Sequence, residues 1–196
     1  MKNGFLLFMV LFLSQALTAQ NYITRTAHIH IRSDNKVQNI VADNYQVACQ
    51  LNTQNGDFKI IALIKSFEYQ IGAMNRVMNT RDINVTDYPR ITYDGKITNL
   101  KQINFSKPGT YPFKINGMLF IWDEKRITPA QGTLTVNSDG SIEGNSDFTI
   151  TIEDKNLNKI DDIIKAKLPG AINLQPNALG ISKDIQVKAT ALLKKP

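Results

Sequence analysis

Two histidines, His28 and His30, have the clearest capacity for metal chemistry, and the sequence contains no others. On an extended strand, a spacing of two residues places both side chains on one face. Zinc needs at least one more ligand, usually a histidine, a cysteine or a carboxylate, so a site would require an acid such as Asp34 or Asp43. Because Arg32 shares the face, we interpret it as a polar surface in contact with solvent and expect no metal site.

Cys49 is the only cysteine, so an internal disulfide is excluded. It follows the apolar residues Val47 and Ala48, and no histidine is near it in the sequence. A reactive thiol requires neighbours that stabilise the thiolate. We therefore predict that Cys49 is a small buried core residue rather than a nucleophile.

The chain has many serines and acids, but none stands in a recognisable catalytic motif. Nucleophilic catalysis needs a nucleophile, a base and an orienting group, and no serine lies in a Gly-x-Ser-x-Gly turn. A glycine-rich phosphate loop is also absent from the sequence. Four acids lie close enough in the sequence to act as a catalytic pair, but we predict them on the solvent-exposed face of a helix and on the segment that precedes it. They are Glu153, Asp154, Asp161 and Asp162. We expect neither an enzyme nor a cofactor.

Strands dominate the predicted secondary structure. Residues 27–32 alternate between polar and apolar side chains, which is typical of a half-buried strand. Further strands are predicted over 44–51, 58–69, 90–97, 111–122, 131–136, 148–153 and 185–193. Turns are predicted at 55–57 and 137–140, a helix or ordered loop at 71–84, and a short helix at 157–168. Within 58–69, adjacent Ile60 and Ile61 indicate a bulge or burial on both faces.

Seven or eight closely spaced strands predict an all-β protein with an antiparallel sandwich or barrel. About eight strands make a barrel wide enough for one small ligand. The segment 111–122 becomes apolar on both faces near its end, as expected of a strand covered by a second layer or by a ligand. The apolar residues that we predict to line a ligand site are Phe67, Tyr69, Met74, Met78, Tyr93, Phe113, Ile115, Met118, Phe120, Trp122 and Phe148.

The first residues predict export. Lys2 precedes an apolar stretch, Phe5–Leu13, and small residues follow up to Ala19, as in a secretory signal peptide. We therefore expect a signal peptide over 1–19, one domain over 20–196, and a periplasmic or secreted location with no stable membrane span after cleavage. The 23 basic residues are spread along the chain, which argues against a nucleic-acid surface.

Several of these segments occur in an order that resembles the YceI-like family of exported lipid-binding proteins. The best-matching segment is 64–97, where Lys65-Ser66-Phe67-Glu68 is followed by Tyr88-Pro89 and an aromatic strand. The other matching segments are 27–29, 40–44, 109–111, 115–119 and 148–154. The resemblance implies an extended lipocalin-like antiparallel β-barrel that binds a polyisoprenoid or a similar amphiphile in an apolar tunnel.

The sequence departs from the family pattern at two positions. Where the family carries a histidine between Met74 and Asn79, this chain has Val77, and where the family carries His-Gly it has Trp122-Asp123. Headgroup contacts made by those histidines are therefore absent here. Two alternatives to a lipid-binding barrel stay open: a barrel with a filled core that contacts a protein partner, and a hydrolase or isomerase for an apolar substrate.

Overall fold

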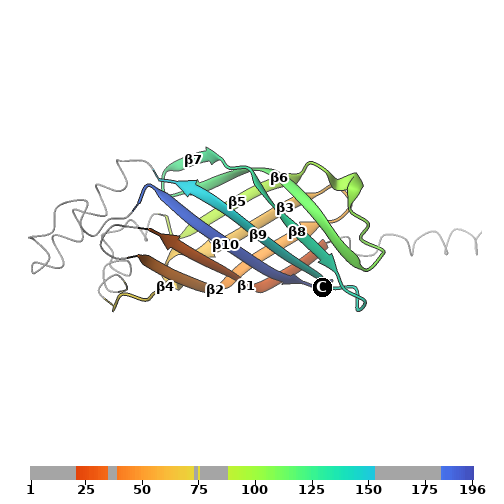
Figure 1. Cartoon of the computed structure of the whole chain (residues 1–196), viewed down its shortest axis with the longest axis horizontal. Coiled ribbons are helices and arrows are strands. Elements are labelled where there is room, and N and C mark those ends of the chain that lie inside the picture. The colour runs from red at the N-terminus through yellow and green to blue at the C-terminus, as the bar shows by residue number, and fades with distance from the viewer. Residues whose placement is uncertain (1–20, 35–38, 73–74, 76–87, 153–181) are drawn as a thin grey trace, which may run out of the picture.

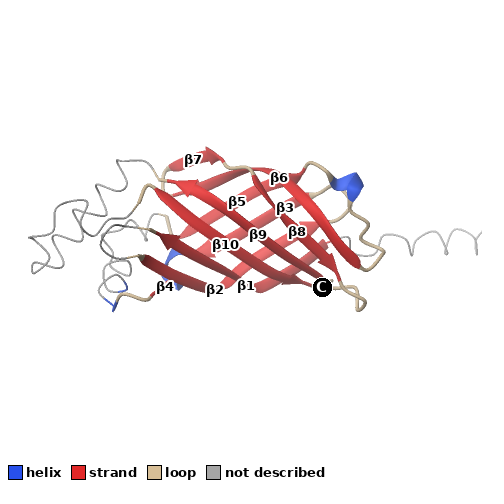
Figure 2. Cartoon of the chain, in the orientation of Figure 1, coloured by secondary structure: helices blue, strands red, loops and turns tan. Residues whose placement is uncertain are grey.

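The computed structural model describes residues 21–34, 39–72, 75, 88–152 and 182–196. Figure 1 shows long strands that run obliquely around a closed sheet, and Figure 2 shows that strands make up almost all of the described secondary structure. Among the described residues, no helix is long and apolar enough to cross a bilayer. The strands are β1 (Asn21–Ser33), β2 (Ile40–Asn52), β3 (Asp57–Leu63), β4 (Glu68–Tyr69), β5 (Arg90–Ile97), β6 (Gly109–Ile121), β7 (Glu124–Ile127), β8 (Ala130–Val136), β9 (Ile142–Thr151) and β10 (Asp184–Leu193).

Closure of the sheet depends on β1, which pairs with β10 on one side and with β2 on the other. The order around the barrel is β1-β10-β9-β8-β6-β5-β3-β2, and every pairing is antiparallel. The two short strands stand outside this ring, β4 beside β2 and β7 beside β6. The prediction of an antiparallel barrel of about eight strands is confirmed.

Alternation along each strand separates an apolar interior from a polar exterior. On β6, Phe113, Ile115 and Leu119 are buried, whereas the intervening Lys114 and Asn116 are exposed. The barrel is closed at the end that carries the C-terminus, because buried apolar residues from the strand ends and the following loops fill it. These residues are Tyr22, Leu51, Ile97, Ile103, Val136, Ile142 and Leu193.

The opposite end of the barrel, which we call the β4 end, carries β4 and the β6–β7 turn (Figure 1). There a 3₁₀ turn over Ile64–Ser66 interrupts the long strand that the sequence predicts over 58–69. The amide of Phe67 donates a hydrogen bond to the carbonyl of Ile64, so the chain bends inward before β4. A run of apolar residues predicts burial, but it does not by itself distinguish a strand from a bend.

Of the two explanations that the sequence offers for Ile60-Ile61, the bulge is not there, since both residues pair in regular register with β2 and β5. Both side chains are half-buried, so neither face of β3 is fully exposed at this point. The register shifts lie between β1 and β2, around Ala27 and around Tyr45-Gln46. Asn44 fixes the second shift from the buried side. Its side chain accepts a hydrogen bond from the amide of Gln46 and donates one to the carbonyl of Leu63. The remaining predicted strands are confirmed, 90–97 with the same bounds and the others with bounds that begin earlier. The segment 157–168 and most of 71–84 lie outside the described residues.

Glycines at a close approach between β5 and β6 make room for an aromatic ring. A Cβ at Gly117 would lie 2.3 Å from Cζ of Tyr93, so the ring of Tyr93 occupies the space of the missing side chain. The Tyr93 hydroxyl reaches past it and donates a 2.8 Å hydrogen bond to the carbonyl of Thr128. Gly117 is therefore needed for space, since its φ is not positive.

We predict that Gly117→Ala destabilises the fold by about 1–3 kcal/mol, because Tyr93 must move and its hydrogen bond to Thr128 is strained. Gly144→Ala is the matched control, since a Cβ there meets nothing nearer than Leu134 Cδ2, at 3.4 Å. Urea denaturation of both variants provides the measurement. Equal stabilities for the two variants would contradict the packing described for Tyr93.

Candidate functional site

The barrel interior contains two cavities, one behind the other along the same strands. The central cavity has a volume of about 50 Å³ and the end cavity about 110 Å³. Along β1, Ala27 and Ile29 line the central cavity and Ile31 lines the end cavity. The same succession occurs on β9 and β10, where the lining passes from Phe148 to Ile150 and from Ala189 to Val187. The two cavities are therefore successive sections of one lumen.

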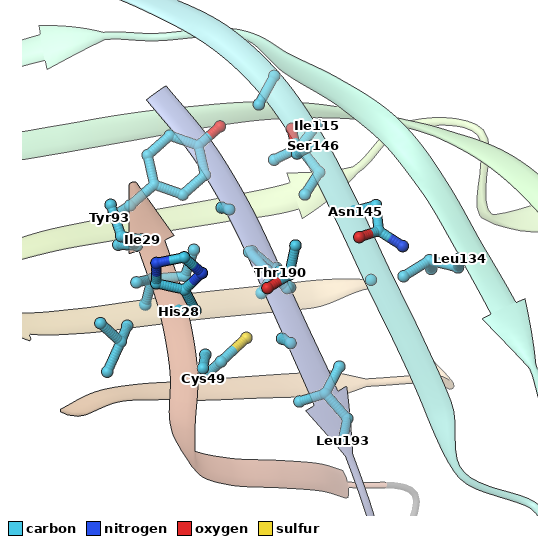
Figure 3. A pocket seen from close by; sticks show the side chains of 18 of the residues that line it. His28, Ile29, Cys49, Tyr93, Ile115, Leu134, Asn145, Ser146, Thr190 and Leu193 are labelled. Carbon is cyan, nitrogen blue, oxygen red and sulfur yellow. The ribbon is translucent and has the colours of Figure 1, made fainter. Parts of the chain in front are cut away.

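The central cavity is surrounded by apolar side chains from several strands of the barrel (Figure 3). Figure 3 places Tyr93 of β5, Cys49 of β2 and Leu193 of β10 on different sides of it. Two of its hydroxyl groups already have partners. Besides the hydrogen bond of Tyr93, the Ser146 hydroxyl donates a 2.7 Å hydrogen bond to the carbonyl of Gln131. The hydroxyls of Tyr93 and Ser146 are therefore already engaged with backbone carbonyls, and the remaining lining is mostly apolar, as suits an apolar chain.

The end cavity lies at the β4 end of the barrel, and isoleucines provide much of its wall. Aromatic side chains enter from the segments that follow β3 and β6: Phe67 and Tyr69 from the first, and Trp122 from the second. Burial raises the pKa of the Tyr69 hydroxyl, so this side chain stays neutral. The complete lining is Ile31, Ser33, Ile40, Ile64, Phe67, Tyr69, Ile91, Ile121, Trp122, Ile150, Ile152, Ile185 and Val187.

Seven of the eleven residues that the sequence predicts for the lining lie on these cavities, divided between the two. Tyr93, Phe113, Ile115 and Phe148 line the central cavity. Phe67, Tyr69 and Trp122 line the end cavity. Strand alternation accounts for Phe113 and Ile115, whereas Trp122, predicted on the opposite face of the same strand, reaches the end cavity from the turn after β6.

Met118 and Phe120 lie on the outer face, and neither lines a cavity. They alternate along β6 with Leu119, which is buried inside, and they pair with β7 residues. The ammonium of Lys125 lies 5.6 Å from the ring centroid of Phe120 and covers it from outside. We therefore remove both residues from the candidate lining. Met74 and Met78 lie outside the described residues.

Sequence reasoning missed two groups of lining residues. Ala130, Ala189 and Ala191 leave open space around the central cavity because their side chains are small. The isoleucines of the end cavity were missed because we took aromatic residues and methionines as the signs of a ligand site. Inward alternation on β9 and β10 was the signal that could have found part of both groups, namely Ala189, Ala191, Ile150 and Ile185.

The imidazoles of the two histidines are half-exposed and converge on one carboxylate. His28 also borders the central cavity (Figure 3). His28 Nε2 and His30 Nδ1 donate hydrogen bonds of 2.7 and 2.9 Å to the same Asp43 oxygen. The ring of His28 also stacks on Tyr45, with centroids 4.3 Å apart. Burial opposes the ionisation of Asp43, but the hydrogen bonds from His30 and His28 outweigh it and keep the pKa of Asp43 below its ordinary value.

This surface cluster fits a structural role, because Asp43 ties β2 to β1 next to the register shift. Within the described residues, no group of three or more histidine, cysteine, aspartate or glutamate side chains is arranged to hold a metal ion. Asp34, the other acid considered as a third ligand, instead pairs with Arg32.

The fold and the interior define a closed antiparallel β-barrel with small, apolar-lined cavities in its lumen. Comparison with solved structures agrees with this class. A polyisoprenoid binding domain from Saccharophagus degradans, implicated in plant cell wall breakdown, matches with a TM-score of 0.73 and 12% identity over 91% of this chain and 100% of that domain.

Two mutants of the Campylobacter jejuni YceI protein match with a TM-score of 0.52 each, over 83% of this chain and 90% of theirs, at 12% and 13% identity. One of them contains monobromobimane as a guest. No family model and no curated protein sequence matches the chain. The resemblance to YceI-like proteins is thus confirmed in the fold.

We predict that Cys49 is almost inert towards Ellman's reagent in the native protein. Burial raises its pKa to about 12. At pH 8 its thiolate fraction is then about 10⁻⁴, roughly a thousandfold below that of an ordinary thiol with a pKa of about 8.5. Labelling in the presence and absence of guanidinium chloride measures the difference. Equal rates would show that the interior is open to solvent at this position.

We predict that Asp43→Asn lowers the free energy of unfolding at pH 7 by about 1 kcal/mol, because both histidine hydrogen bonds lose their charged acceptor. A depressed folded-state pKa adds stability above the unfolded pKa of about 3.9, and this contribution disappears as the pH falls through the folded pKa. The difference between the variant and the wild type should therefore shrink as the pH falls below about 3.9 and through the lowered folded-state pKa. Denaturation over a series of pH values from neutral to acid, with the exposed Asp147→Asn as control, measures this, and a deficit independent of pH would contradict it.

Proposed function

We propose that this protein is an exported binding protein that holds an amphiphilic apolar molecule, of the polyisoprenoid or acyl-lipid class, in the lumen of its barrel. The observation that carries the proposal is the succession of two apolar cavities along one closed barrel. Burial of apolar ligand surface there would supply roughly 25 cal/mol per Å² before the entropic costs of binding. Export rests on the signal peptide predicted over 1–19.

The geometry supports entry from the β4 end. Buried side chains such as Leu51 and Leu193 fill the C-terminal end, and the central cavity lies between that end and the end cavity. A chain that enters beside Trp122 would pass the isoleucines first and place its apolar end near Ala189. The fold of a polyisoprenoid binding domain supports the same class of ligand.

The polar groups of the lumen support binding without chemistry. The hydroxyls of Tyr93 and Ser146 donate to backbone carbonyls, and the half-exposed imidazoles of the two histidines are hydrogen-bonded to Asp43. Cys49 carries a thiol whose raised pKa makes it a poor nucleophile. A general base next to a nucleophile is not found among the described lumen residues.

A second function, a filled barrel that contacts another protein, is favoured by the size of the free space. Volumes of about 50 and 110 Å³ are below the roughly 300–1,000 Å³ of usual ligand pockets. A binding function therefore requires that side chains between the two cavities move when the ligand enters. Leu119 is one such side chain, since it is buried on β6 between Ile115 of the central cavity and Ile121 of the end cavity.

We predict that Ala189→Leu weakens uptake of cis-parinaric acid at least tenfold, because the larger side chain fills the central cavity. Ala48→Leu is the matched control, since Ala48 alternates on β2 with the buried Val47 and Cys49 and faces outward. Fluorescence titration measures uptake, and thermal melting checks that both variants fold. Wild-type protein that takes up no probe would contradict the binding function and favour the filled barrel.

A further inference from the structure

The β6–β7 turn holds the only tryptophan of the sequence in an unusual backbone conformation. Ile121 pairs with Glu124, so Trp122 and Asp123 form a two-residue hairpin loop. Trp122 has a φ of +52°, and no other described residue except glycine has a positive φ. Glycine adopts this conformation most readily, and for a bulky residue it is an outlier. The surrounding structure therefore holds this indole where it is.

The indole nitrogen is buried without a partner. Trp122 lines the end cavity, and its Nε1 is shielded from solvent. Among the described residues, no hydrogen-bond acceptor is found for this N–H group. Buried donors almost always have an acceptor, because leaving one unpaired forfeits its interaction with water. An unpaired donor beside an apolar cavity therefore points to an acceptor that a ligand brings.

We propose that the Trp122 Nε1–H group is the polar anchor of the lumen and that it donates a hydrogen bond to an acceptor oxygen on the ligand. This inference rests on the proposed binding function and narrows its ligand class. The donor selects an amphiphile with a carbonyl, ether, ester or hydroxyl oxygen at one end over a pure hydrocarbon. A tryptophan N–H only donates, so the ligand must supply the acceptor.

The position of Trp122 sets the direction in which the ligand lies. In the central cavity, the inward hydroxyls of Tyr93 and Ser146 already donate to the carbonyls of Thr128 and Gln131. The donor that is both shielded from solvent and unpaired is the Trp122 N–H group, which is located at the β4 end. The polar end of the ligand stays at the β4 end beside Trp122, and its apolar chain extends towards Ala189.

The test compares 2-tridecanone, which carries an acceptor, with tridecane, which does not. The anchor is removed in two ways: by Trp122→Phe, and by biosynthetic replacement of the indole with benzothiophene, which keeps the ring shape without the N–H. Because the chain has one tryptophan, the replacement affects position 122 alone. Isothermal titration of wild-type and altered full-length protein gives the preference for the ketone over the hydrocarbon.

We expect the ketone preference to fall about twofold to tenfold in both altered proteins, the loss of one neutral hydrogen bond. In the benzothiophene protein, which keeps the ring shape, the affinity for tridecane should stay within about twofold. In wild-type protein labelled with ¹⁵N-tryptophan, the single indole signal should move downfield with 2-tridecanone and not with tridecane. If both altered proteins lose the ketone preference to the same extent, the loss comes from the missing N–H group. A change in packing caused by Trp122→Phe would affect that variant alone.

Two results would overturn the anchor, and they have different consequences. If both probes bind and the ketone preference is the same in the wild-type and altered proteins, the anchor is wrong and the proposed binding function stands. If neither probe binds the wild-type protein, the binding function fails and the anchor fails with it.

Discussion

The rest of the structure depends on the two-sided pairing of β1. Its hydrogen bonds to β10 join the last strand of the chain to the first, and its hydrogen bonds to β2 complete the ring. Once the sheet is closed, every inward side chain must share one enclosed volume. Two neighbouring residues of β2 stabilise the pairing with β1. Asn44 forms buried hydrogen bonds at the register shift, and Asp43 accepts hydrogen bonds from His28 and His30 on the outside of the sheet.

The sizes of the inward side chains then determine which parts of the enclosed volume are filled and which stay open. Large buried residues such as Leu51 and Ile142 fill the C-terminal end, whereas Ala189 and its small neighbours leave space in the middle. At the β4 end, the bend after β3 and the turn after β6 bring Phe67 and Trp122 over the opening of the lumen. The proposed binding function and the proposed anchor follow from this distribution, since apolar space and an unpaired donor occur in one lumen.

Much of the fold could be predicted from the sequence because alternation and turn residues are local signals. The strand at 27–32 and the Gly56 turn, with its φ of +78°, are examples. Closure and register could not be predicted, since they depend on pairings between distant segments such as β1 and β10. Alternation along β6 correctly selected Phe113 and Ile115, which line the central cavity. Met118 and Phe120 were selected because the other face of the same strand is also apolar, and that face lies on the exterior of the barrel.

Chemical roles were harder to predict than positions. His28 and His30 share a face as expected, but their common partner Asp43 belongs to another strand and could only be considered among other acids. The unpaired state of the Trp122 N–H depends on everything packed around it, and no local pattern contains that information.

Native mass spectrometry of the protein purified from its host without detergent, followed by organic extraction, tests the central claim most directly. The account predicts a mass above that of the polypeptide, which returns to the polypeptide mass on unfolding, with the release of a hydrophobic molecule that carries an oxygen acceptor at one end. A polypeptide mass alone, together with no uptake of added isoprenoids or fatty acids, would contradict it and favour a filled barrel that acts through a protein partner.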